Sequence, residues 1–138
     1  MRLRKLAEPW APKTVAEAPL PDAIDRLEID TDDSLTVQDA VSLTLAFGSN
    51  RPGSGQIVND GTLGLDGTAS LTQLLFEGDL ILSGGGTLAL SNSTQNRVAA
   101  TGNEATLVNE VGHRIEGAGK LEAYRIENLG TLAATGTN

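Results

Sequence analysis

The chain has 138 residues, no Cys, and a formal net charge of −8 that arises from 18 acidic and 10 basic residues. The absence of Cys excludes a disulfide framework, a thiolate nucleophile and a Cys-based metal cluster. The negative charge argues against nucleic acid as a main partner, because phosphate binding requires a basic face. Gly is abundant, with 16 residues, while Trp, Tyr and Phe together number four. This composition favours a narrow core of small aliphatic side chains.

Residues 1–22 form a block that contains four of the five prolines of the chain. This spacing prevents a stable helix and favours an extended, polyproline-like arm. We expect the arm to have no regular secondary structure and no contact with the rest of its own chain. It is either disordered or laid along the surface of a partner. Its basic residues, Arg2, Arg4 and Lys5, are too few for a membrane or nucleic-acid site and are followed by Glu8.

The N-terminus begins like a signal peptide, but Glu8, Pro9 and Lys13 interrupt the apolar core that such a peptide needs. No stretch of the sequence has the apolar length of a transmembrane helix. We therefore expect either that the chain reaches the outside of the cell within a particle, or that a different leader has been cut away and replaced.

Residues 23–46 alternate between apolar and polar side chains, as in IDRLEID at 24–30 and SLTVQDAVSLTLAF at 34–47. A period of two, with Thr and Val enriched, predicts strands. A helix over residues 36–47 is the alternative, although Thr and Ser weaken it. The following segment, GSNRPGSG at 48–55, has the composition of a loop.

From residue 56 onward, short apolar-alternating runs follow one another and are separated by turns that contain Gly or Asn. Gly-Thr-Leu recurs at residues 61–63, 86–88 and 130–132, and a longer phrase links IVNDGTL at 57–63 with IENLGTL at 126–132. The motifs return every 19 to 25 residues, a spacing within the range of solenoid repeats. A coil that cannot bury its apolar face alone must stack on the next one.

We therefore predict an all-β fold, a right-handed parallel β-helix (β-solenoid) of about five coils over residues 23–138, with the extended arm at its N-terminus. Six side chains should point inward and stack in columns: Leu63, Leu65, Leu88, Leu90, Ile126 and Leu132. An antiparallel sandwich or barrel is the rival, because Asp60-Gly61 and Asp66-Gly67 suit hairpin turns. Repetition of one motif in one register favours the solenoid. The last residues, TLAATGTN, stop in mid-pattern, and we expect the solenoid to be truncated there.

The tract 56–138, in particular residues 57–92 and 105–132, resembles the low-complexity coils of large bacterial surface proteins. It is similar to the β-helical stalks of filamentous-haemagglutinin-type adhesins and autotransporter passengers, and to the coils of β-helical tail spikes and fibres of bacteriophages. The resemblance implies a rod that displays or connects binding surfaces. No family motif assigns a site residue to a position of this chain.

His113 is the single histidine and lies between Glu110 and Glu116. A general base needs a nucleophile or a substrate pocket beside it, and the flanking sequence offers neither. We predict an outward-facing strand residue near acidic neighbours.

Four carboxylates cluster in DTDDSLTVQD: Asp30, Asp32, Asp33 and Asp39. An EF-hand loop that began at Asp30 would need Gly and Glu where Leu35 and Val41 stand, so a solvated acidic turn is predicted. The Gly84–Gly86 run lacks the Lys-Ser/Thr ending of a phosphate loop and no helix follows it. Carboxylates for glycoside cleavage are available in principle as Glu77, Asp79, Glu104 and Glu110, but the sequence does not place two of them on one face.

The sequence thus predicts a structural protein, not an enzyme, with no catalytic, cofactor-binding or metal-binding residue. We expect a virion tail spike or fibre whose arm, residues 1–22, attaches to other tail proteins and whose solenoid supports host-receptor binding. A homotrimer and a cell-surface glycan or protein receptor are the expected partners, without nucleic acid or membrane. The alternative is a stalk fragment of an adhesin or autotransporter, at the bacterial surface or secreted. A polysaccharide-degrading tail spike is the third hypothesis.

Overall fold

The computed structural model describes residues 13–15, 26–46 and 55–136, and all regular elements within these ranges are β-strands. The strands in chain order are β1 (Lys13–Val15), β2 (Arg26–Ile29), β3 (Ser34–Gln38), β4 (Ser42–Ala46), β5 (Gly55–Asn59), β6 (Thr62–Asp66), β7 (Thr72–Glu77), β8 (Leu80–Ser83), β9 (Thr87–Leu90), β10 (Asn96–Ala100), β11 (Thr106–Asn109), β12 (Arg114–Gly117), β13 (Lys120–Glu122), β14 (Arg125–Asn128) and β15 (Thr131–Ala134).

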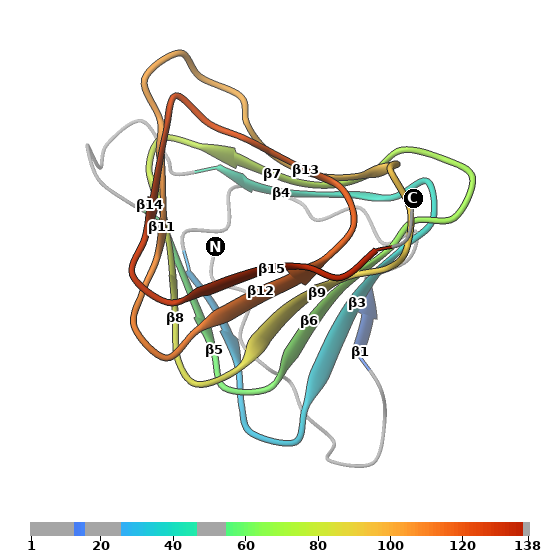
Figure 1. Cartoon of the computed structure of the whole chain (residues 1–138), viewed down its shortest axis with the longest axis horizontal. Coiled ribbons are helices and arrows are strands. Elements are labelled where there is room, and N and C mark those ends of the chain that lie inside the picture. The colour runs from blue at the N-terminus through green and yellow to red at the C-terminus, as the bar shows by residue number, and fades with distance from the viewer. Residues whose placement is uncertain (1–12, 16–25, 47–54, 137–138) are drawn as a thin grey trace.

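The strands form three parallel sheets that the chain visits in a fixed order. The sheets have the strand orders β2-β5-β8-β11-β14, β1-β3-β6-β9-β12-β15 and β4-β7-β10-β13. We name them the first, second and third sheet, after the order in which each coil passes through them. Figure 1 shows the triangular cross-section, in which the chain turns anticlockwise as it advances towards the viewer, so the helix is right-handed.

The predicted right-handed parallel β-helix of about five coils is confirmed. Four complete coils of three strands run from β2 to β13, and β14 and β15 begin the fifth. Parallel pairing between the described strands excludes the antiparallel sandwich. The alternative helix over 36–47 is excluded as well, because β3 and β4 are separated by a turn in which Ala40 has a φ of 65°.

The recurrence of Gly-Thr-Leu is explained by the register of the second sheet. Its central inward column contains, from coil to coil, Leu35, Leu63, Leu88, Ile115 and Leu132. The preceding Gly stands at the corner where the first sheet passes into the second. A Cβ at Gly86 would lie 2.3 Å from the carbonyl oxygen of Gly61 in the coil below. The three Gly-Thr-Leu copies therefore require Gly, because at Gly61, Gly86 and Gly130 the backbone of the coil below approaches too closely for a side chain.

The six predicted core residues occupy inward positions, but their burial depends on the coil. Leu63, Leu65 and Leu88 are fully buried, and Leu90 is partly buried. The expectation of burial is wrong for Ile126 and Leu132, whose exposed fractions are 42 % and 49 %. Both pair in register, with Leu107 and Ile115 below them, and no described coil lies on their other side.

The coils vary in length more than the motif spacing indicates. In the first sheet the equivalent residues Gly55, Leu80, Leu107 and Ile126 give successive coils of 25, 27 and 19 residues. Ile126 therefore aligns with Gly55. The repeated phrase predicted that it would align with Ile57, and that alignment is wrong. The last step is short because only Ala118-Gly119 and Ala123-Tyr124 connect the strands on either side of β13.

The predicted arm contains one strand of the solenoid. β1 pairs with β3 in parallel, from Lys13 opposite Leu35 to Val15 opposite Val37. The expectation that the arm makes no contact with its own solenoid is wrong for these three residues. The rest of residues 1–22 lies outside the described ranges.

Candidate functional site

His113 lies at the corner where the chain passes from β11 to β12. The turn before it closes through a hydrogen bond from the backbone N–H of His113 to the carbonyl oxygen of Glu110 at 3.1 Å. Because His113 precedes Ile115 by two residues, both side chains point to the same side of the sheet. That side is the interior, and the exposed fraction of His113 is 1 %. The prediction of an outward-facing histidine is therefore wrong.

The imidazole of His113 connects two asparagine side chains from different coils. Its Nδ1 lies 2.6 Å from Oδ1 of Asn109, and its Nε2 lies 3.2 Å from Nδ2 of Asn59. Asn59 Nδ2 also donates to the carbonyl oxygen of Thr87 at 2.9 Å, which orients its amide. The ring nitrogen that faces an N–H donor must accept. Nε2 is therefore unprotonated, and Nδ1–H donates to Asn109.

The contact between His113 and Asn59 crosses a whole coil. Asn59 belongs to the second coil and His113 to the fourth, while the corner of the third coil consists of Gly84–Gly86. No side chain stands between them at this corner, so the imidazole reaches the lower asparagine. The run of three glycines thus has a packing role.

The polar chain continues towards the last coil. Asn109 Nδ2 donates to Oδ1 of Asn128 at 2.7 Å and to the carbonyl oxygen of Thr131 at 3.1 Å. We call Asn59, Asn109, His113 and Asn128 the polar corner. It ties the second, fourth and fifth coils together through side chains.

Burial lowers the pKa of His113 from its ordinary value of 6.5 to about 4, because the charged imidazolium loses its hydration there. The surrounding amides fit the neutral ring, since Nε2 faces an N–H donor. Neither of the acidic neighbours is a partner of the ring. Glu110 is exposed, and Glu116 pairs with Arg114. The arrangement therefore supports packing between coils and not proton transfer to a substrate.

Asp39 stands apart from the other acidic residues of its cluster. Its Oδ1 accepts backbone hydrogen bonds from Thr68, Ala69 and Ser70 at 2.8, 3.2 and 3.0 Å. These bonds, chiefly the one from Thr68, lower the pKa of the carboxyl group. The carboxylate thereby holds the corner of the next coil, at the point where the third sheet begins.

The remaining members of the acidic cluster lie at the other end of β3. Asp30 and Asp32 are exposed in a turn that closes with a backbone bond from Asp33 to Asp30, and Asp32 has a φ of 69°. A strand of this length spans about 17 Å, so these carboxylates do not converge with Asp39. Among the described residues, no three His, Cys, Asp or Glu side chains form a group that could hold a metal ion.

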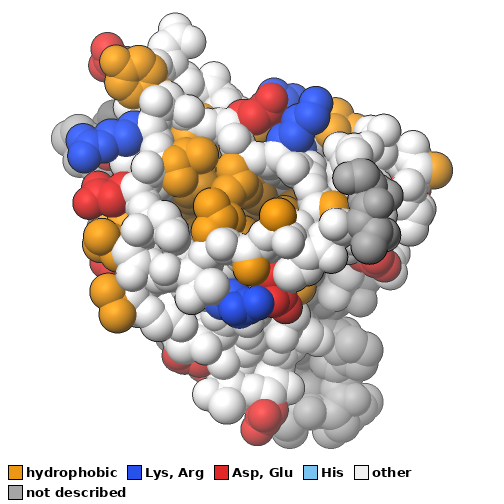
Figure 2. All heavy atoms as spheres, in the orientation of Figure 1, with side chains coloured by type: hydrophobic (Ala, Val, Ile, Leu, Met, Phe, Trp, Pro, Cys, Tyr) orange, Lys and Arg blue, Asp and Glu red, His pale blue; other side chains and the backbone are white. Residues whose placement is uncertain are grey.

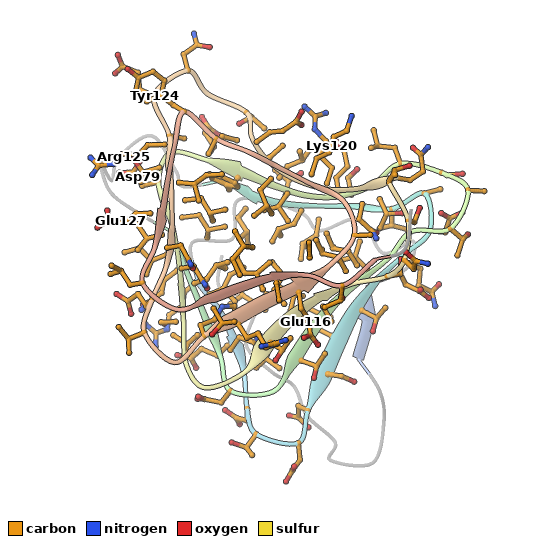
Figure 3. All side chains as sticks on the ribbon, viewed as in Figure 1. Asp79, Glu116, Lys120, Tyr124, Arg125 and Glu127 are labelled. Atoms are coloured by element: carbon orange, nitrogen blue, oxygen red, sulfur yellow. The ribbon has the colours of Figure 1, made fainter. Side chains whose placement is uncertain are left out.

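Of the four carboxylates considered for glycoside cleavage, three lie at the corner between the third and first sheets and one lies at the next corner. Asp79 precedes β8, and its Oδ1 accepts a hydrogen bond from the backbone N–H of Thr106 at 2.7 Å (Figure 3). Glu77 and Glu104 are exposed near the same corner, while Glu110 lies at the next one, before β12. Asp79 is therefore used to hold the neighbouring coil.

Asp60 repeats the arrangement of Asp39 and Asp79, with its Oδ1 accepting from the backbone N–H of Gly85 at 2.8 Å. The role of these three aspartates as connectors between coils was not predicted. A signal was available, because each one lies in a short connection between two strands, where unpaired N–H groups are expected.

Asn96 forms a second buried polar centre that the sequence analysis missed. Its side chain is completely buried at the start of β10. Oδ1 accepts from the backbone N–H of Gly67 at 2.9 Å, and Nδ2 lies within hydrogen-bonding distance of carbonyl oxygens of Ser91 and Ala118. Asn96 therefore links three successive coils at the corner between the second and third sheets.

The described part of the chain holds no helix with the length and hydropathy needed to cross a membrane. The chain matches no family of known proteins, no curated protein and no solved structure.

Proposed function

We propose that the chain is a structural, non-catalytic β-solenoid segment of a virion tail spike or fibre, anchored to the particle by residues 1–22 and supporting the binding of a host receptor. The structural role is supported by one observation: the side chains that could perform chemistry make contacts between coils. Asp39, Asp60 and Asp79 bind backbone N–H groups of neighbouring coils, and His113 bridges two buried asparagines.

A stacked solenoid suits a role in spacing and support. Each coil contacts chiefly its neighbours, so stability accumulates along the rod. The side-chain bonds at the corners add to the backbone bonds between parallel strands. Asn96 bonds to the coils on both sides of its own, and the contact between His113 and Asn59 in the polar corner joins the second coil to the fourth. A rod held in this way keeps a binding surface at a fixed distance from its attachment point.

The assignment to a virion rests on the resemblance of residues 56–138 to tail-spike coils and on the proline-rich composition of residues 1–22. A homotrimer and a glycan or protein receptor at the host surface belong to the same proposal. A stalk of a bacterial adhesin uses the same kind of coil, so the attachment of residues 1–22 to a particle is the property that separates the two roles.

The test is incorporation into particles, measured by co-sedimentation of tagged chains with purified virions. Deletion of residues 1–22 should abolish incorporation. Deletion of residues 1–12 alone leaves β1 (Lys13–Val15) in place and separates anchoring from any effect on the sheet that β1 joins. We expect this shorter deletion to abolish incorporation too, with an unchanged far-ultraviolet circular dichroism spectrum. Incorporation of both deletion variants at the level of the full chain would refute the anchoring role.

Catalysis is tested separately with oligosaccharides from the host surface. The full chain should leave them intact. Cleavage that disappears in a Glu77→Ala, Glu104→Ala double variant would support the polysaccharide-degrading alternative. These two residues suit the test because both side chains are exposed, so their removal should not unfold the solenoid.

A further inference from the structure

The corner between the first and second sheets exposes an apolar side chain on the fourth coil. Val111 lies there between β11 and β12, and its exposed fraction is 79 %. The fifth coil follows it with β14 and β15, so Val111 belongs to a coil that is stacked on both sides. One exposed apolar residue needs no partner by itself. The surface beside the corner decides whether Val111 belongs to an interface.

The outer face of the first sheet, which adjoins this corner, is apolar at its centre. Val58, Ile81 and Val108 point outward from the successive strands β5, β8 and β11, because the residues on either side of each are buried. All three are half-buried. The described part of the third sheet has one large aliphatic residue on its outer face, Leu75, between the buried Leu74 and Phe76. We call the surface formed by Val58, Ile81 and Val108 the apolar face.

A flat face that binds an adjacent corner joins parallel rods into a closed ring of three. The contact uses two different patches of each chain, so it is heterologous, and a two-fold axis does not produce it. In a triangular cross-section (Figure 1) the direction to a corner lies about 60° from the perpendicular to either adjacent side. Copies joined in this way are rotated by about 120° relative to one another, and the ring closes after three.

We propose that the apolar face of one copy receives the corner between the first and second sheets of the next copy, in a homotrimer of parallel rods. The inference names the interface of the homotrimer in the proposed function and rests on that part of it. Figure 2 shows hydrophobic side chains at the left edge of the molecule, where Figure 1 places the first sheet and this corner. A three-fold axis along the rods leaves every coil at its own height, so each corner meets the face of the same coil in its neighbour.

The two surfaces complement each other in shape on the third and fourth coils. The corner of the third coil consists of Gly84–Gly86, and the face at this height carries Ile81, the largest residue of the apolar face. On the fourth coil the corner carries Val111, and the face carries the smaller Val108. The largest side chain of the face therefore meets a corner without side chains, while the exposed valine meets an apolar strand. Such matching permits the close packing that stable interfaces need.

The first and second coils complement each other in polarity. The exposed Asp60 at the corner of the second coil meets Gln56, whose side-chain amide can donate to a carboxylate. On the first coil the corner carries the exposed Asp32, and the face carries Arg26. In the first four coils, the described residues of these corners include carboxylates but no Lys or Arg. The acidic side of the contact therefore meets the single cation that the first sheet presents there.

The first test measures the oligomeric state of the full 138-residue chain by analytical ultracentrifugation. Val111→Asp changes the corner, and Ile81→Asp changes the face. Each should raise the concentration at which half of the chain is trimeric by about tenfold or more, because a charge would be buried without a partner. An unchanged far-ultraviolet circular dichroism spectrum shows that each variant keeps the solenoid.

Leu75→Asp is the matched control for Ile81→Asp. It introduces the same charge in place of a half-buried aliphatic residue, but on the outer face of the third sheet. The concentration for half-trimerisation should stay within about threefold of the parent value. A trimer that is weakened equally by all three substitutions would contradict the assignment of the interface to the first sheet.

A charge reversal tests whether coils of equal height meet. Arg26→Asp and Asp32→Lys should each place like charges opposite one another and weaken the trimer by about threefold. The combined variant restores opposite charges and should return close to the parent. Arg26 pairs with Glu28 of its own chain, and Asp32 has a φ of 69°, which Asp tolerates better than Lys. Both losses persist in the combined variant, so they cannot produce the recovery.

A cross-link between two different chains distinguishes this contact from a two-fold one. The chain has no Cys, so a tagged Val111→Cys chain can be mixed with an untagged Val108→Cys chain and treated with a short bis-maleimide. The mixture should yield a linked pair that contains one chain of each kind. A tagged Val111→Cys chain mixed with an untagged Leu75→Cys chain should not yield one.

Three outcomes would overturn the interface: a parent chain that is monomeric at about 100 μM, a trimer that persists in both Val111→Asp and Ile81→Asp, and equal linkage in the two mixtures. Anchoring to the particle is measured separately, by co-sedimentation of the deletion variants. A trimer that is insensitive to these substitutions therefore refutes the interface and leaves the proposed function standing.

Discussion

The Nε2 atom of His113 lies 3.2 Å from the Nδ2 atom of Asn59, although 54 residues separate them in the sequence. The contact is possible because the intervening coil turns this corner with glycines. It fixes the imidazole in its neutral form, since Nε2 faces a donor. A proton on Nε2 would replace an attraction by a repulsion between two N–H groups.

This relationship predicts a pH-dependent stability. The pKa of His113 is about 4 in the folded chain and 6.5 in the reference state, so the unfolded chain binds more protons between these values. The contribution of the neutral His113 to the free energy of unfolding is fully present above pH 6.5 and decreases as the pH falls towards 4. The loss amounts to about 3 kcal/mol. Urea unfolding at several pH values measures it.

The matched variant is His113→Gln, which keeps polar atoms at the site but does not titrate. Other carboxylates titrate in both chains, so the difference between the two pH profiles isolates the histidine. We expect the variant to lose less stability than the parent between pH 6.5 and 4. Parallel profiles over that range would show that the ring is accessible to protons in the folded state.

The close approach at the Gly-Thr-Leu corner predicts a sharp contrast between neighbouring glycines. Gly86→Ala places a Cβ 2.3 Å from the carbonyl oxygen of Gly61, and backbone atoms must move to accommodate it. We expect a destabilisation of about 3 kcal/mol. Gly85→Ala would meet only Oδ1 of Asp60, at 3.8 Å, and should change the unfolding free energy by less than about 1 kcal/mol. Equal effects of the two substitutions in thermal unfolding would contradict this account of the motif.

The fold could be predicted from the sequence because stacked coils impose equivalent positions on it. Leu63 and Leu88 follow the same Gly-Thr pair and occupy the same column. The short apolar-alternating runs expected from residue 56 onward correspond to the strands β5 to β15. Alternation of apolar and polar residues was sufficient, since every coil buries one face of each strand.

His113 was misplaced because its motif copy is degenerate. His113-Arg114-Ile115 occupies the positions of Gly-Thr-Leu, as the pairing of Arg114 with Thr87 and Thr131 shows. The inward orientation could have been predicted, because His113 precedes the apolar Ile115 by two residues. The acidic neighbours Glu110 and Glu116 instead suggested an outward-facing side chain. The partners of the ring were not readable, because Asn59 lies two coils away.

The exposure of Ile126 and Leu132 was missed for a different physical reason. Alternation shows which side of a strand faces inward but not whether another coil covers that side. Ile126 and Leu132 continue their columns correctly and are exposed because of their place in the stack. The hydrogen bonds of Asp39, Asp60 and Asp79 depend likewise on which corners stack, since their acceptor oxygens meet N–H groups 25 to 31 residues away.

Within one inward column, a Leu→Ala substitution should cost different amounts of stability, depending on whether coils cover the side chain on both sides. Leu88→Ala removes a fully buried side chain between Leu63 and Ile115, and we expect a loss of about 2–4 kcal/mol. Leu132→Ala removes a side chain that is about half exposed and should cost less than about 1.5 kcal/mol in the monomer. Urea unfolding of each variant and of the parent measures both losses.

Asp39 supplies the last prediction. Its three backbone hydrogen bonds hold residues 68–70, and they lower the pKa of its carboxyl group. The stabilisation is therefore present above the ordinary pKa of 3.8 and is lost as the pH falls through the lower value of the folded chain. At neutral pH, Asp39→Ala should lower the thermal midpoint more than Asp39→Asn, which keeps one carbonyl acceptor but no charge.

Glu77→Ala removes an exposed carboxylate at a comparable corner and should have little effect. If Asp39→Ala were as mild as Glu77→Ala at neutral pH, the hydrogen bonds to residues 68–70 would not contribute to stability. Faster amide hydrogen exchange at residues 68–70 in Asp39→Ala, but not in Glu77→Ala, would place the lost protection at the corner that this carboxylate holds.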